Sequence, residues 1–110
     1  MINANLDGGL KNFINQHVTS FLVWDLLVFF HKNPAAVDDV FELSKKIGRG
    51  MDDIELAASE LVNKSILRRE KKVYEYAASD EMKALVATFV GALDDRETRL
   101  WILSEVLQRR

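Results

Sequence analysis

Cysteine is absent from this chain of 110 residues, which excludes a disulfide framework and a zinc site with thiolate ligands. Histidine occurs only at His17 and His31, and neither has other potential ligands at metal-binding spacing. A glycine-rich phosphate loop is also lacking, because Gly48-Arg49-Gly50 follows a predicted helix and not a strand. We therefore expect no enzymatic activity, no cofactor and no metal.

Long apolar runs are lacking as well. The longest covers residues 21–30, is interrupted by Asp25, and is far shorter than the ~20 residues that a membrane span needs. Residues 1–10 contain no basic region followed by an apolar stretch, so we expect no secretory signal. A hydrophobic fraction of 48% with 29% charged residues is typical of a folded domain. We expect a loose leader over residues 1–9, a single domain over residues 10–110, and a soluble cytoplasmic protein with no membrane contact.

Three helices are predicted in the first half of the chain. A second helix over residues 20–32, capped by Thr19 or Ser20 and stopped before Pro34, is apolar on nearly every side and is expected to lie centrally. A third helix covers about residues 38–48, ends at Gly48, and has an inner face of Val40, Leu43 and Ile47. The first helix is short and is indicated by apolar residues at helical spacing, namely Leu10, Phe13 and Ile14.

The fourth predicted helix, over residues 52–64, has the clearest start. Asp52 is a good N-cap and Glu55 follows three residues later, which is the pattern of a capping box. Met51 and Leu56 occupy the two positions of a hydrophobic staple around this start. The buried stripe of the helix is expected to consist of Ile54, Ala57, Ala58, Leu61 and Val62.

The second half continues with a hairpin and a long helix. Residues 66–70 and 73–77 favour strands, with Lys71-Lys72 between them. Two lysines suit a tight two-residue turn poorly, so the turn is expected to consist either of these two residues or of one or two more. Ser79 caps a last helix over residues 80–107, which is either continuous or kinked near Gly91.

The predicted order is helix, helix, tight turn, helix, two-stranded hairpin, helix. Residues 40–48 look like the first helix of a helix-turn-helix motif, and residues 52–67 look like the second helix running into a wing strand. On these segments the chain resembles small bacterial winged helix-turn-helix regulators of the MarR-like kind. The resemblance implies a mainly α fold with a small β-hairpin, and a long C-terminal helix. It also implies a DNA-binding transcription regulator, often dimeric.

Basic side chains gather in the middle of the sequence. Residues 45–72 hold eight basic and five acidic residues, whereas the segments before and after are net negative. Such a local excess is a candidate phosphate-binding surface on duplex DNA. Its predicted phosphate contacts lie on the third helix, the turn and the wing: Lys45, Lys46, Arg49, Arg68, Arg69, Lys71 and Lys72.

The helix that would read base edges is poorly suited to that task. Ser59 and Asn63 are its only ordinary base contacts, and the common guanine readers Arg and Lys are missing from its outward face. Carboxylates at 52, 53, 55 and 60 stand where phosphates would approach. The sequence therefore predicts DNA binding of low specificity, with a protein-interaction module that does not bind DNA as the alternative.

Apolar residues at the C-terminal end give a further expectation. Leu100, Trp101, Leu103 and Leu107 form an apolar surface wider than one domain face needs, which favours a homodimer through the last helix. The alternative is that these residues pack onto the first helix of the same chain. Asp25 is expected either to face solvent or to pair with a basic group. The aromatic residues expected in the core are Phe21, Trp24, Phe29, Phe30 and Phe41.

Overall fold

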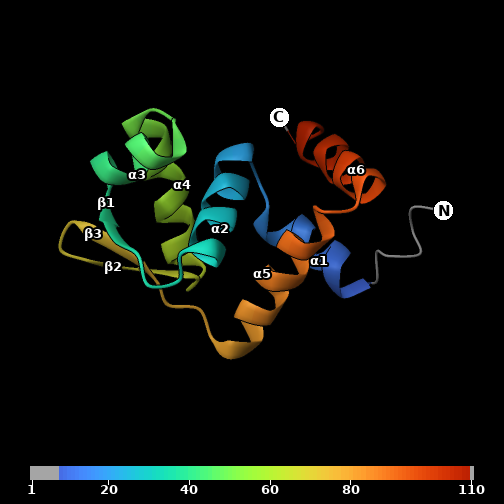
Figure 1. The fold of residues 1–110 in the computed structure, drawn as a ribbon, viewed down its shortest axis with the longest axis horizontal. Helices are drawn as coiled ribbons and strands as arrows, with labels where there is room; N and C mark the ends of the chain where they lie inside the picture. The colour runs from blue at the N-terminus through green and yellow to red at the C-terminus, as the bar shows by residue number, and fades with distance from the viewer. Residues whose placement is uncertain (1–7, 110) are drawn as a thin grey trace.

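A computed structural model describes residues 8–109 of the chain. The fold is mainly helical with a small antiparallel sheet, and Figure 1 shows its elements in chain order. They are α1 (Gly8–His17), α2 (Phe21–Lys32), β1 (Val37–Asp39), α3 (Val40–Ile47), α4 (Met51–Asn63), β2 (Leu67–Glu70), β3 (Val73–Tyr76), α5 (Asp80–Ala92) and α6 (Arg96–Leu107).

The first two helices agree with the predictions in most respects. The apolar residues predicted for α1 are all buried, and Ser20 caps α2 by accepting a hydrogen bond from the backbone N–H of Val23 at 3.2 Å. Gly8 and Gly9, which were expected in the leader, are the first residues of α1. The rest of the predicted leader, residues 1–7, lies outside the described residues.

The start of α3 differs from the prediction. Residues 37–39 form the short strand β1, which the sequence analysis missed, and the helix begins at Val40 and not near residue 38. Asp39 caps it: its carboxylate accepts from the Glu42 N–H at 2.8 Å, and the Glu42 side chain accepts from the Asp39 N–H at 2.9 Å. Gly48 ends the helix as predicted, with a left-handed φ of 80° that favours glycine.

The predicted capping box at the start of α4 is wrong. Gly50 is the N-cap residue and makes no side-chain hydrogen bond, so Asp52 lies inside the first turn. The predicted staple is absent too, because Met51 is 48% and Leu56 is 72% exposed. The two carboxylates of the first turn, Asp52 and Asp53, still interact favourably with the positive end of the helix dipole.

The three strands form one antiparallel sheet in the order β1-β3-β2. Glu70 pairs with Val73, so only Lys71 and Lys72 lie in the turn between β2 and β3. Of the two alternatives, the turn is therefore the shorter one, and the longer one is wrong. The tight turn requires Lys71 to adopt a positive φ of 57°, which costs energy for a residue with a Cβ atom.

The predicted C-terminal helix over residues 80–107 is two helices. Ser79 caps α5 as predicted, and Asp95 caps α6 by accepting hydrogen bonds from the backbone and hydroxyl of Thr98. These hydrogen bonds lower the pKa of the Asp95 carboxyl. The break therefore lies over residues 93–95 and not at Gly91.

Figure 1 shows α2 between two groups of elements. The sheet, α3 and α4 lie on one side, and α1, α5 and α6 lie on the other, which gives extents of 45 × 28 × 21 Å. Of the aromatic residues predicted in the core, Phe30 is buried, whereas Phe41 is 55% exposed and was misplaced. The others pack against the core while partly buried, namely Phe21, Trp24 and Phe29.

Taken singly, the helices of residues 8–109 are all too short or too polar to cross a membrane. Within the part of the chain that the structure describes, only the pair α1 and α2 reaches the required length and composition together, and it is bent by 116°.

Candidate interaction surface

Three of the seven predicted phosphate-binding cations are held in ion pairs. Lys46 lies 2.9 Å from the buried Asp38 carboxylate, and Arg68 lies 2.7 Å from Glu75, its cross-strand neighbour. Arg49 lies 3.1 Å from the Asp25 carboxylate, so of the two expectations for Asp25, pairing with a basic group is the one that holds. These three cations are therefore partly neutralised within the chain.

The other four cations have no carboxylate within ion-pair distance among residues 8–109. Lys71 and Lys72 are exposed at the tip of the hairpin. The Arg69 guanidinium lies 5.8 Å from the centre of the Tyr74 ring and donates to the Lys71 carbonyl at 3.0 Å. The fourth, Lys45, lies 5.3 Å from the centre of the exposed Phe41 ring. The remaining positive charge thus lies on the hairpin and α3.

The outward face of α4 carries negative and apolar groups. Asp52, Asp53 and Glu55 are exposed, and their carboxylates make no hydrogen bond or ion pair with other described residues. We call these three residues the acidic patch. Of the predicted base contacts, Asn63 is exposed at the C-terminal end of the helix, whereas Ser59 is only partly exposed. The face therefore offers few hydrogen-bond donors to a nucleic acid.

Glu60 differs from the other α4 carboxylates. It accepts a hydrogen bond from the Thr19 hydroxyl and lies 3.2 Å from the Lys64 ammonium group. Lys64 also donates to the carbonyl of Gln16 in α1. Glu60 was predicted to point outward, but the fold uses it to connect α4 to the α1–α2 linker.

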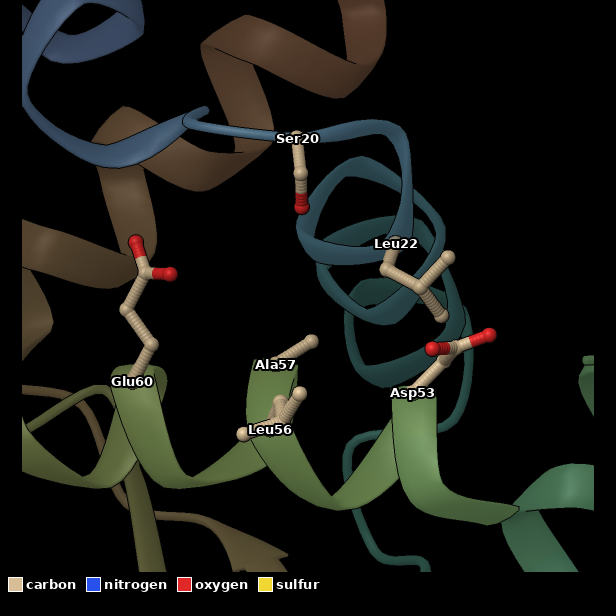
Figure 2. Close-up of a pocket in the computed structure, with 6 residues that line it drawn as sticks. All are labelled: Ser20, Leu22, Asp53, Leu56, Ala57 and Glu60. Atoms are coloured by element: carbon tan, nitrogen blue, oxygen red, sulfur yellow. The ribbon is translucent and has the colours of Figure 1, made fainter. Parts of the chain in front are cut away.

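An open groove of about 370 Å³ runs between α4 and the start of α2. Figure 2 shows Ser20, the N-cap residue of α2, and Leu22 of α2 facing the side chains of α4, with carboxylates at the two ends and apolar groups between them. We call this the α4 groove, and its lining residues are Ser20, Leu22, Asp53, Leu56, Ala57 and Glu60. An apolar floor with an acidic rim suits a protein segment with apolar and basic side chains.

A second hollow of about 240 Å³ lies on the other side of the first turn of α4. We call it the hairpin cleft, because β2, β3 and their turn form one wall. Its apolar part includes the exposed Phe41 and Met51, and its cations are Arg69 and Lys72. The remaining lining residues are Asp39, Val40 and Tyr74. The hairpin cleft is therefore lined by two cations and one carboxylate, whereas the α4 groove is lined by two carboxylates and no cation.

Three of the residues predicted for dimerisation, Leu100, Leu103 and Leu107, share one side of α6 by their helical spacing, and Trp101 lies beside them. Leu100 and Leu107 are 51% and 53% exposed, and Leu103 and Trp101 are half-buried. The opposite face of the helix is buried in the same chain through Thr98, Ile102 and Val106. The Arg109 side chain also donates to the carbonyls of Ile14 and Val18, so α6 is attached to α1.

The two histidines do not form a common site. Burial lowers the pKa of His17, whose ring lies 5.1 Å from that of Phe13, whereas His31 lies in the last turn of α2. Among residues 8–109, no three potential metal ligands lie together.

No protein-family model, curated protein or solved structure matches the chain. The features of the described residues that bear on function are therefore the two hollows and their charges.

The sequence analysis missed several residues of this surface. Phe41 and Met51 were assigned to the core and to a staple, although both are exposed in the hairpin cleft. Leu22 was placed only within an apolar helix, and nothing in its spacing indicates that it faces α4. The one available signal was the Asp-x-x-Glu sequence at residues 39–42, which marks the true start of α3 and puts Phe41 in its first turn.

Proposed function

We propose that this chain is a winged-helix domain that binds another protein through the outward face of α4. The order of the elements supports the fold assignment, because a helix, a short strand, two helices and a hairpin follow one another. The sheet order β1-β3-β2 supports it as well, since the hairpin then lies beside α4 as a wing. In this arrangement α4 occupies the place of the recognition helix.

The observation that carries the proposal is the exposure of Leu56. It is 72% exposed on α4, where it lines the α4 groove beside the acidic patch. Full burial of a leucine contributes about 1.5–3 kcal/mol, so covering Leu56 favours association. A phosphate backbone supplies little apolar surface for this purpose, whereas a protein partner does.

The charges on α4 support the same conclusion. Most of the affinity of a DNA-binding protein comes from cations that neutralise phosphates. The acidic patch would instead bring three carboxylates towards the phosphates, with no cation among the residues on that face. A protein segment with basic residues meets the same surface with complementary charge.

Site-specific cross-linking tests the proposal. A photoreactive amino acid replaces Leu56 in one variant and Ala84, an exposed residue of α5, in the matched control. Both variants are irradiated in cells that produce the protein. The expected result is a protein adduct for position 56 only. Adducts with nucleic acid at position 56, or equal protein adducts at both positions, would contradict the proposal.

The four unpaired cations support one second candidate, which is DNA binding through the sugar–phosphate backbone. Lys45, Arg69, Lys71 and Lys72 lie on the hairpin and α3 and are available to phosphates. Four contacts predict a log–log dependence of affinity on salt with a slope of about −3.6, against about −6.3 for all seven predicted cations. Fluorescence anisotropy with a mixed-sequence duplex measures this slope. A slope near −3.6 that Lys71→Glu/Lys72→Glu abolishes would establish DNA binding, and no binding at low salt would exclude it.

A further inference from the structure

We infer that the partner of this surface is a second copy of the same chain, held in a two-fold dimer. In this dimer the acidic patch of each copy faces the hairpin cleft of the other. The inference rests on the proposed function, because it assigns an occupant to the α4 face. It places the dimer contact on α4 and the hairpin, and not on α6 as the sequence analysis expected.

The acidic patch and the hairpin cleft, which have opposite net charges, adjoin each other. The acidic patch consists of Asp52, Asp53 and Glu55 in the first turns of α4. Arg69 and Lys72 line the hairpin cleft together with a single carboxylate, Asp39, so the charge of the cleft is net positive. Met51, the first residue of α4, lies in that cleft as well. Met51 therefore marks the boundary between the negative and the positive patch.

Two-fold symmetry brings the two patches of one copy against those of a second copy. A two-fold axis in the plane of an interface places each side of a surface opposite the other side of the same surface on the second copy. With the axis near Met51, the acidic patch of each copy meets Arg69 and Lys72 of the other. Both contacts then pair opposite charges, whereas a face of one sign would repel its own copy.

Exposed apolar side chains lie within the proposed contact surface. Phe41 and Met51 are 55% and 48% exposed in the hairpin cleft, and Leu56 is 72% exposed beside the acidic patch. Large apolar side chains surrounded by charged groups are typical of an interface with an apolar centre and a polar rim. A standard interface of about 800 Å² per partner would cover about an eighth of the 6500 Å² surface.

The exposed face of α6 is the competing dimer surface. Leu100 and Leu107 are exposed there, but α6 has only 12 residues and a coiled coil of that length is marginal. Arg96 and Glu97, which have opposite charges, lie next to each other at the N-terminal end of α6. They therefore form no patch of one sign that could pair with a patch of the other sign on a second copy. Charge complementarity therefore selects the α4 and hairpin surface over α6.

Two charge-reversed variants test the dimer. Asp52→Lys/Glu55→Lys makes both patches positive, and Arg69→Glu/Lys72→Glu makes both negative. Analytical ultracentrifugation over a concentration series should show that each variant alone self-associates at least about tenfold more weakly than the wild type. An equimolar mixture should recover the dimer as a heterodimer, because both contacts then pair opposite charges. Circular dichroism confirms that each variant is folded.

The wild type provides a measurement that does not depend on the folding of any variant. Its association constant should fall as salt is raised, because screening weakens the ionic contacts. Three results would overturn the inference. The association constant could be independent of salt concentration, the dimer could persist in both charge-reversed variants, or it could be lost only in Leu100→Lys/Leu107→Lys.

The outcomes also separate this inference from the proposed function. The photoreactive residue at position 56 should give an adduct of two copies of the chain. A wild type that stays monomeric at every concentration, with position 56 cross-linked to a different protein, would overturn the dimer and leave the proposed function standing. A monomer with no protein adduct would overturn both.

Discussion

The ion pair between Asp38 and Lys46 should contribute to stability and not to nucleic-acid binding. The Asp38 side chain is 7% exposed, and Lys46 lies within 3.1 Å of both its carboxylate oxygens. No other described residue donates to this carboxylate. Removing the ammonium group therefore leaves a buried charged acceptor without a partner, which costs more than losing a pair at the surface.

Lys46→Met is the most informative change, because methionine keeps much of the aliphatic stem and removes the charge. Leaving a buried acceptor unsatisfied costs about 1–3 kcal/mol, and we expect about 2 kcal/mol. For a chain of this length, the unfolding entropy converts 1 kcal/mol into a shift of about 4 °C. Thermal unfolding followed by circular dichroism should therefore show a midpoint about 8 °C lower.

Two controls separate this effect from a general loss of surface charge. Arg68→Met removes the cation of the exposed pair with Glu75, and the midpoint should hardly change because exposed pairs contribute little. In an Asp38→Asn background, Lys46→Met should cost less than about 0.5 kcal/mol, since no buried charge remains. An equal cost in both backgrounds would refute the reasoning.

Three further predictions concern caps, glycines and pH. Asp39→Ala should lower the free energy of unfolding by about 1 kcal/mol in urea denaturation, whereas Asp52→Ala, which removes no cap, should change it by less than about 0.5 kcal/mol. Gly48→Ala should destabilise by about 1–2 kcal/mol because φ is 80°, whereas Gly91→Ala, with open space around its Cβ position, should stabilise by about 0.5 kcal/mol. The pKa of His17 is lowered in the folded state, so the unfolded state binds the proton more readily, and stability falls as the pH drops below 6.5. In a series of thermal midpoints measured against pH, His17→Gln should remove this part of the decline.

Elements with local signals were predictable from the sequence. The spacing of Leu10, Phe13 and Ile14 gave α1, and Gly48 gave the end of α3. β1 was not predictable in this way, because Val37–Asp39 is too short to carry a pattern. It exists through its pairing with β3, about 36 residues further along the chain.

The misplaced capping box has a similar cause. Asp39–Glu42 and Asp52–Glu55 have the same Asp-x-x-Glu pattern, and local sequence does not distinguish them. Pairing of β1 with β3 keeps Asp39 extended, so the next residue is the first of a helix. Gly50 is already extended at the entry to α4, which places Asp52 two residues beyond the N-cap position.

The same non-local contacts explain why the charge of the middle segment was misleading. Residues 45–72 have three more basic than acidic side chains. In the fold, Lys46, Arg49 and Arg68 take their partners from outside that segment, and the three carboxylates are Asp38, Asp25 and Glu75. These partners offset the excess of three, so the segment and its three partners together carry no net charge. What remains is an acidic patch beside a basic cleft, and such a pair of patches attracts a surface with the same arrangement more strongly than a polyanion.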